Sequence, residues 1–210
     1  MSSTTPSPAA SARRGRRPGA PDTRAAILES ARSAFAGKGF AGTTIRGVAA
    51  AAGVDAALVH HYFGTKDDLF LAAMELPVDP RQVIGPALAG GPDGAGERLL
   101  RAFLSLWDDP EISPSLVGVV RSSLQPGGER LMTQGFVPVV LMPAGAALGI
   151  DRPDLRMPLV ISQVAGLILA RYLIGLEPIA SMPADTLVAT YAPVIQHYLT
   201  GDLGAGLREG

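Results

Sequence analysis

Residues 53–70 read GVDAALVHHYFGTKDDLF, and this stretch decides the fold. Gly53 is a residue type that commonly ends a helix, and Asp55 is one that commonly caps the start of the next helix. Val59 and Phe63 are four positions apart, so a helix that begins after Asp55 turns both of them toward one side. The pattern predicts a very short helix with an apolar inner face, which leaves two histidines for the outer face.

The same stretch predicts where the following helix begins. Thr65 and Asp68 have the three-residue spacing of a capping box, in which each side chain bonds the backbone of the other residue. Pro77 and Pro80 follow soon afterwards, and proline interrupts the hydrogen bonding of a helix interior. We therefore expect a helix from Thr65 to about residue 76 that does not continue as one straight helix.

Two further helices are predicted on the N-terminal side. Thr44 is a favourable capping residue, and apolar residues repeat at helical spacing after it. An earlier helix can be capped by Asp22 or Thr23, and the glycines of residues 37–39 end it. Residues 44–63 then form two short helices joined by a glycine-containing turn, which is a helix-turn-helix.

Basic residues are concentrated in the first third of the chain. The formal net charge is only −1, but residues 1–66 carry nine Lys and Arg against three acidic residues. The rest of the chain carries nine Arg against sixteen acidic residues. A basic head on an acidic body is typical of a domain that binds a polyanion.

The N-terminal residues 1–20 are rich in Ser, Pro, Ala and Arg and lack the apolar core of a secretory signal. We expect a disordered basic arm and a cytoplasmic location. The arm is either a solvated tail or a source of phosphate and minor-groove contacts. Its arginines are Arg13, Arg14, Arg16 and Arg17.

Residues 39–70, GFAGTTIRGVAAAAGVDAALVHHYFGTKDDLF, resemble the DNA-binding domain of the TetR/AcrR family of transcriptional regulators. The resemblance implies an all-α fold with a helix-turn-helix DNA-binding domain at residues 21–80. It also implies a helical ligand-binding and dimerisation domain at residues 81–210. The matching positions are Gly39, Phe40, Thr43, Thr44, Ile45, Val48, Ala49, Ala52, Gly53, Val54, Tyr62, Phe63, Lys66 and Leu69.

The resemblance further implies which side chains meet double-stranded DNA. Arg46 is our candidate for a guanine contact, because its planar fork suits the O6 and N7 atoms. His60 is expected to reach the major groove and Lys66 to contact a phosphate. The full predicted set is Thr43, Thr44, Arg46, Ala56, Ala57, His60, His61, Tyr62 and Lys66.

Two parts of this prediction have alternatives. Tyr62 either contacts a phosphate or mainly packs, because tyrosine has an apolar body and a polar tip. Ala56, Ala57 and Leu58 stand where relatives often have Ser, Lys, Pro, Gly or Thr, and their side chains donate no hydrogen bonds. They can touch thymine methyl groups, so DNA shape is expected to supply part of the specificity.

The sequence predicts no metal, cofactor or catalytic residue. His60 and His61 are adjacent, so on a helix they point about 100° apart and cannot easily share one ion. The chain has no cysteine, which excludes thiolate ligands and disulfides. It also shows no glycine-rich phosphate loop and no clustered nucleophile and base, so an enzyme is only a rival hypothesis.

The most apolar stretch is residues 151–178, whose length raises the alternative of a membrane span. Gln163 and Arg171 interrupt it, so we expect instead a helix buried nearly all round. A last helix is predicted at about residues 184–200. The resemblance implies that these last two helices form the four-helix interface of a homodimer.

A small-molecule effector is also implied, with a mostly apolar pocket. Met and aromatic residues can line such a pocket, although a stripe of these residues is more often plain core. The candidate lining residues are Phe103, Trp107, Arg121, Met132, Phe136, Met142, Gln163, Arg171 and Tyr172.

The leading hypothesis is a ligand-responsive, homodimeric repressor that binds a palindromic operator. The alternatives are an enzyme, a DNA-binding protein without sequence preference or sensor function, and a membrane-associated helical protein. A single short recognition helix reads few base pairs, whereas a two-fold dimer reads two half-sites about 34 Å apart.

Overall fold

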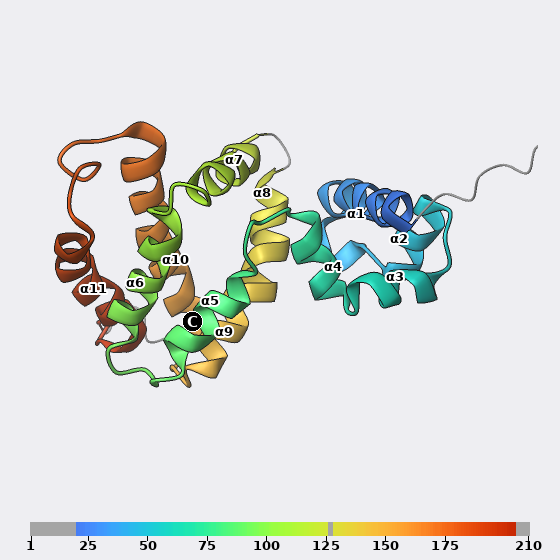
Figure 1. The fold of residues 1–210 in the computed structure, drawn as a ribbon. Helices are drawn as coiled ribbons and strands as arrows, with labels where there is room; N and C mark the ends of the chain where they lie inside the picture. The colour runs from blue at the N-terminus through green and yellow to red at the C-terminus, as the bar shows by residue number, and fades with distance from the viewer. Residues whose placement is uncertain (1–19, 126–127, 205–210) are drawn as a thin grey trace, which may run out of the picture.

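The computed structural model describes residues 20–125 and 128–204, and all regular elements within them are helical. The predicted all-α fold is confirmed. The predicted N-terminal arm lies outside the described residues, apart from its last residue. Figure 1 shows an elongated molecule with a small group of helices at one end and a larger group at the other.

Four helices form the smaller group, which we call the head. They are α1 (Ala20–Gly42), α2 (Ile45–Ala52), α3 (Ala56–Phe63) and α4 (Lys66–Ala73). Gly39 interrupts α1 with φ 69° and ψ 176°, so the first regular helix ends where residues 37–39 predicted a stop. The left-handed φ favours glycine because it has no Cβ.

The remaining helices form the larger group, which we call the body. They are α5 (Pro80–Leu88), α6 (Ala95–Trp107), α7 (Ser113–Ser123), α8 (Gly128–Leu131), the π-helical η1 (Met132–Leu141), α9 (Met142–Ala147), α10 (Pro153–Ile168), the π-helical η2 (Leu169–Ile174) and α11 (Ala184–Thr200). The expected break between α4 and α5 is confirmed.

The core of the head is aromatic and is shared with the body. Phe70 of α4 meets Phe35 of α1 edge to face, with 5.2 Å between ring centroids, and both side chains are almost fully enclosed. Phe40 stacks on Phe35 at 5.9 Å. Val139 and Val140 of η1 belong to this same core. The head therefore does not close its core alone.

A second core fills the body between α6, α10 and α11. Leu100 and Leu104 of α6 pack there with Leu187 and Leu199 of α11, and all four are at most 2% exposed. Gly96 lets the start of α6 approach the backbone of α11, because a Cβ at this position would collide with that backbone. The last helix thus lies directly against α6.

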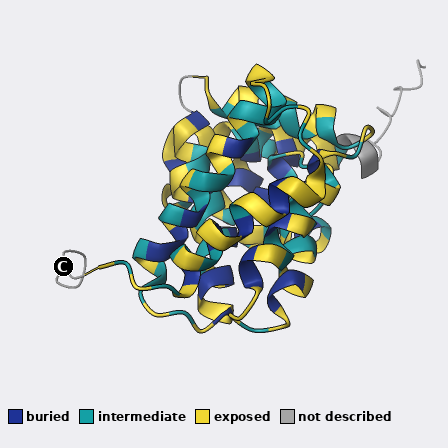
Figure 2. Cartoon of the chain, turned by 90° about the vertical axis from the view of Figure 1, so that its left-hand side faces the viewer, coloured by how far each residue is buried: buried dark blue, intermediate teal, exposed yellow. Residues whose placement is uncertain are grey.

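The prediction of a helix buried nearly all round at residues 151–178 is wrong for the single chain. Pro153–Ile174 is long and apolar enough to cross a membrane by length and composition, but only 17% of its most apolar window is buried. The segment packs on α9 and α11 and, through Val160, Leu167 and Tyr172, on α6, and most of its residues are exposed or half-buried. Figure 2 looks onto the end of the body that contains α11, where exposed and half-buried residues alternate with buried ones.

Candidate nucleic-acid interface

Side-chain caps fix both helices of the helix-turn-helix. The Thr44 hydroxyl accepts a hydrogen bond from the Gly47 N–H at 3.1 Å, and Asp55 Oδ1 accepts one from the Ala57 N–H at 2.7 Å. Gly53 turns the chain between the helices with a left-handed φ of 68° and ψ of 30°. The predicted caps and turn are confirmed, so the local sequence sets where α2 and α3 begin.

The two helices bury one face and expose the other. Val48 of α2 and Val59 of α3 are fully enclosed in the head core, and Phe63 is 8% exposed. On the outer side of α3, Ala57 and His60 are exposed. The inner face thus anchors α3, and the outer face is free to meet another molecule.

His60 is held in one ring orientation by its own helix. Its Nδ1 lies 2.8 Å from the carbonyl oxygen of Gly64. A carbonyl oxygen only accepts hydrogen bonds, so Nδ1 carries a proton and donates. The other nitrogen, Nε2, is then left for contacts outside the head.

The neighbours of His60 differ in exposure. His61 is exposed, whereas Tyr62 is half-buried and packs against the head core. Their rings meet edge to face with centroids 5.6 Å apart. Tyr62 thus combines a packing role with partial exposure, which suits both alternatives that the sequence leaves open.

Cationic side chains are placed on the aromatic residues of the head. Lys66 Nζ lies 4.3 Å from the centre of the Phe40 ring, and the Arg24 guanidinium lies 5.1 Å from the centre of the Phe63 ring. Cation–π contacts of this kind hold the charge near the surface. Arg46 is exposed on the first turn of α2.

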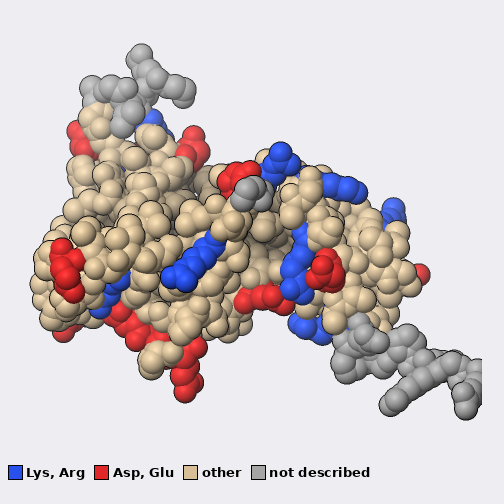
Figure 3. All heavy atoms as spheres, turned by 90° about the horizontal axis from the view of Figure 1, so that it is seen from above, with Lys and Arg blue, Asp and Glu red and all other residues tan. Residues whose placement is uncertain are grey.

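The described surface shows only part of the charge division predicted from the sequence. On the face shown in Figure 3, several Lys and Arg lie on the head with a few Asp and Glu among them, and charged side chains of both signs are scattered over the mostly uncharged body. This view looks down on the α1 side of the head. Residues 20–73, from the start of α1 to the end of α4, carry five Lys and Arg against five Asp and Glu, so most of the basic excess of residues 1–66 comes from the four arginines of the N-terminal residues 1–20.

The expected DNA contact of Thr43 is corrected by its burial. Its side chain is 2% exposed, and its hydroxyl donates to the Gly39 carbonyl oxygen at 2.8 Å. Thr43 therefore stabilises the passage from α1 to α2. The next residue, Thr44, is exposed, so it is the threonine available to a partner.

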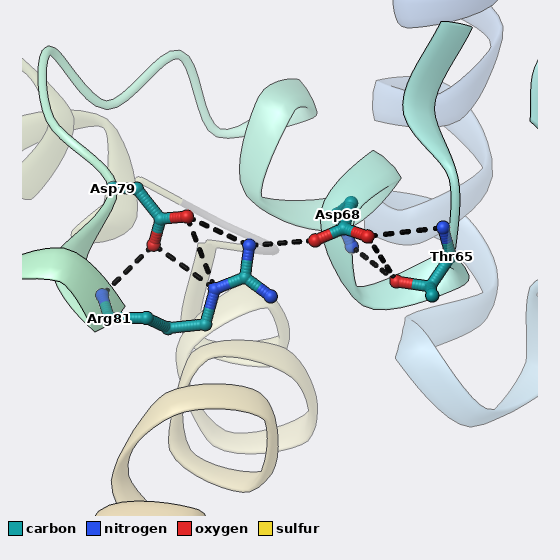
Figure 4. A network of polar contacts seen from close by, with 4 residues as sticks. All are labelled: Thr65, Asp68, Asp79 and Arg81. Atoms are coloured by element: carbon teal, nitrogen blue, oxygen red, sulfur yellow. Dashed lines mark hydrogen bonds and ion pairs between the residues drawn. The ribbon is translucent and has the colours of Figure 1, made fainter. Parts of the chain in front are cut away.

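The start of α4 is fixed by the predicted capping box, and Arg81 joins it. Thr65 Oγ1 accepts from the Asp68 N–H at 3.1 Å, and Asp68 Oδ2 accepts from the Thr65 N–H at 3.1 Å. Arg81 of α5 donates to Asp68 Oδ1 at 2.7 Å (Figure 4). The sequence pattern shows the capping box but not Arg81, which lies 13 positions later.

Four of the nine residues expected around an effector come together at one end of α6. Phe103 stacks on Trp107 with ring centroids 5.4 Å apart, and Tyr172 lies 5.0 Å from Trp107. Burial, followed by the hydrogen bond to Asp108, raises the pKa of Tyr172. The phenol therefore stays protonated near neutral pH and donates to Asp108 at 2.9 Å.

Arg171 lies beside this cluster but is already engaged by the protein. Its Nη1 donates to the carbonyl oxygens of Ile179, Ala180 and Met182 at 2.8–3.0 Å, and its Nε lies 3.2 Å from Asp108. These bonds hold the chain that follows η2. Arg171 is therefore better placed to hold this chain than to anchor a ligand.

The other expected effector residues lie apart from this cluster. Phe136 packs against the head core and Met142 against the body core, while Arg121 is exposed on α7. Met132 and Gln163 are half-buried on η1 and α10. Two open depressions of about 460 and 350 Å³, between α1 and α2 and between α6 and α11, are lined by other residues.

Known proteins resemble the chain over both parts. The sequence pattern described as "Tetracyclin repressor-like, C-terminal domain" matches residues 93–199, and that of "Bacterial regulatory proteins, tetR family" matches residues 27–73. A solved TetR-family regulator from Streptomyces coelicolor A3 is 42% identical, with 88% of this chain and 98% of that chain covered and a TM-score of 0.48.

Two further relatives match at lower coverage or identity. The HTH-type transcriptional repressor AcnR of Corynebacterium glutamicum is 43% identical over 51 residues, which span 24% of this chain and only 27% of that repressor. The TetR-family regulator PfmR of Thermus thermophilus is 25% identical, with 81% and 97% of the two chains covered and a TM-score of 0.41.

The helix-turn-helix thus lies within the residues that match the tetR-family pattern. The match to the C-terminal pattern extends over half of the chain. This protein belongs to the TetR family of DNA-binding transcriptional regulators.

Proposed function

We propose that this protein is a cytoplasmic, non-enzymatic homodimer that represses transcription from a palindromic operator and is released by a small, mostly apolar organic effector. The observation that carries the proposal is the exposed outer face of α3, whose inner face is locked into the head core. Arg46 and Lys66 stand on the two helices that flank α3.

An α-helix fits the major groove of B-DNA, where base edges are distinguishable. We infer that α3 lies in this groove, with His60 and Ala57 toward the bases and His61, Tyr62 and Lys66 toward the backbone. The exposed Thr44 and Arg46 meet the DNA from the start of α2, and the half-buried Ala56 adds apolar contact. Eight residues of α3 span only about 12 Å, so one helix reads few base pairs.

The first prediction is specific operator binding. In a footprint on the DNA that flanks its own coding region, the purified protein should protect two symmetric half-sites centred about one helical turn apart. Affinity for this fragment should exceed that for random duplex by roughly 10³ or more at physiological salt. Equal affinity for every duplex would favour a DNA-binding protein without sequence preference.

The second prediction separates backbone contacts from base reading. Lys66→Ala should weaken binding to operator and random duplex by the same factor, and should lower the salt slope by about 1 per subunit. Arg46→Ala should cost about 1–3 kcal/mol and relax base preference. Fluorescence anisotropy titrations at several salt concentrations measure both.

The control for this pair is Arg101→Gln, which removes one positive charge from the body. Arg101 pairs with Glu97 and Asp185, remote from the helix-turn-helix in sequence and fold. The Arg101→Gln variant should bind the operator with the same affinity and the same salt slope as the wild type. Unchanged affinity in both the Lys66 and Arg46 variants would contradict the assigned contacts.

Dimerisation accounts for the apolar surface that the single chain leaves open. Leu169, Ile174 and Leu176 in and after η2 are 38%, 70% and 51% exposed, and Val194 of α11 is 40% exposed. Exposed large apolar side chains mark an interaction site when they form a large patch. We infer that α10 with η2 and α11 pair with their copies in a second chain.

The third prediction is that Ile174→Asp yields a monomer, because a buried unpaired carboxylate costs several kcal/mol. Sedimentation velocity measures the mass, and operator affinity should fall with it because only one half-site is bound. Leu124→Asp is the matched control, since Leu124 is 64% exposed at the end of α7. This control should remain dimeric, and a monomeric wild type would refute the dimer.

We infer that the effector binds beside Phe103, Trp107 and Tyr172. Helix α7 follows Phe103 and Trp107 in the chain and has no buried residue, although it contains Leu116, Val117, Val119 and Val120. An apolar helix with so little burial has room to close on a ligand. Binding then changes operator affinity only through a difference in affinity for two conformations.

The fourth prediction uses Trp107, the only tryptophan of the chain. Among small apolar aromatic compounds, those that lower operator affinity should also change Trp107 fluorescence, with a coupling of roughly 5- to 150-fold. Phe103→Leu should weaken this response, whereas Met132→Leu should not. A compound that releases the operator without changing the emission would place the effector elsewhere.

A further inference from the structure

The guanidinium of Arg81 connects the head to the body across the break between α4 and α5. Figure 4 shows it at the centre of a network of four residues, Thr65, Asp68, Asp79 and Arg81. Thr65 and Asp68 belong to the start of α4, while Asp79 and Arg81 belong to the start of α5. The network therefore joins the first turns of two successive helices.

Asp79 orients the side chain of Arg81. Asp79 caps α5 by accepting the Arg81 N–H at 2.9 Å, and its two carboxylate oxygens also accept from Nε at 3.1 and 3.2 Å and from Nη2 at 2.8 Å. This two-point contact fixes the plane of the guanidinium. The same Nη2 then reaches Asp68 Oδ1 at 2.7 Å.

Asp68 links Arg81 to the start of α4, because its second carboxylate oxygen binds Thr65. Oδ2 accepts from the Thr65 N–H at 3.1 Å and from the Thr65 hydroxyl at 2.6 Å. The hydrogen bond from Thr65 and the pairing with Arg81 lower the pKa of Asp68, so its carboxylate is charged at neutral pH. Lys66 follows Thr65 directly and shares the turn that Asp68 holds.

Regular helical hydrogen bonding does not continue from α4 into α5. Residues 74–79 are not helical, Glu75 has a left-handed φ of 52°, and Pro77 has no N–H to donate. The position of the α4 start relative to α5 therefore depends on side-chain contacts. Arg81 is one such contact, and it acts on the turn that carries Lys66.

We propose that Arg81 is a positioning residue for DNA binding, which holds the Thr65–Lys66 turn in place by fixing Asp68 against the first turn of α5. The proposal rests on the proposed function only in its assignment of Lys66 to a DNA phosphate. Arg81 acts through Asp68 and Lys66 and does not itself touch the DNA.

The expected effect is modest because the pair is partly open to solvent. The side chains of Arg81 and Asp68 are 41% and 35% exposed, and ion pairs at such sites contribute at most about 1 kcal/mol. Arg81 therefore adjusts operator affinity and does not hold the fold. We expect Arg81→Gln to raise the operator dissociation constant about 3- to 5-fold.

A double-mutant cycle with Lys66 tests the mechanism. If Arg81 works by placing Lys66, then Arg81→Gln should have almost no further effect in the Lys66→Ala background. Anisotropy titrations of wild type, both single variants and the double variant on the operator fragment give the four affinities. If the affinity loss of the double variant equals the product of the two single losses, Arg81 acts independently of Lys66. That result would overturn the proposal.

Two variants and a DNA-free measurement complete the test. Arg81→Lys keeps the charge and should recover part of the affinity, while Arg101→Gln removes the same charge from another doubly paired arginine and should change nothing. Hydrogen exchange of the free protein should be faster at the Thr65 amide in Arg81→Gln than in wild type. Unchanged exchange there refutes the positioning role even if no operator is found, whereas faster exchange without any operator refutes only the proposed function.

Discussion

The contact between Phe70 and Gly135 is the constraint on which the position of the head depends. The Phe70 ring occupies the space where a Cβ at position 135 would lie. The same ring meets Phe35 and Phe40 edge to face at 5.2 and 5.4 Å, so it is the centre of the head core. Any larger residue at 135 would push η1 away from the head, and only glycine permits this approach.

The adjacent residue on η1 strengthens the same connection. The Gln134 side chain occupies the space where a Cβ at position 39 would lie. Val139 and Val140 then complete the head core from the same π-helix. Because Leu141 and Ile84 pack against both cores, a shift of η1 or α5 in the body must reorient the head. These two elements, with Arg81 as a polar contact beside them, are therefore the route by which the proposed effector binding would reach the head.

Local features of the interface were predictable from the sequence, and long-range ones were not. The caps at Thr44 and Asp55 and the capping box at Thr65 depend on residues within a few positions, so their spacing is enough to identify them. Burial of Thr43 depends on Gly39 and the packing of α1 against α2, which a family motif does not reveal. Arg81 was missed because its partner Asp68 lies across a non-helical break.

The C-terminal helices show a different limit of sequence reasoning. Apolar content predicts that a surface is buried, but not whether the chain's own residues or another copy bury it. The sequence allows two interpretations of residues 151–178, a fully buried core helix or a membrane span. Both interpretations require other apolar groups to surround the helix, and the single chain does not supply them. Leu169, Ile174 and Leu176 remain open to solvent at 38%, 70% and 51%.

A second copy of the chain would account both for the shortness of α3 and for this open apolar surface. Eight residues of α3 span too little of a groove to select one site in a genome, so affinity and specificity require a second copy at a fixed distance. The open surface lies on the elements at the far end of the body from the head (Figure 1). Pairing there leaves both heads free and sets their separation through the two bodies. In the proposed dimer, a small change in the body of each subunit would alter the spacing of two α3 helices at once, so the one effector site per chain that we propose would be sufficient to control binding to a two-fold operator.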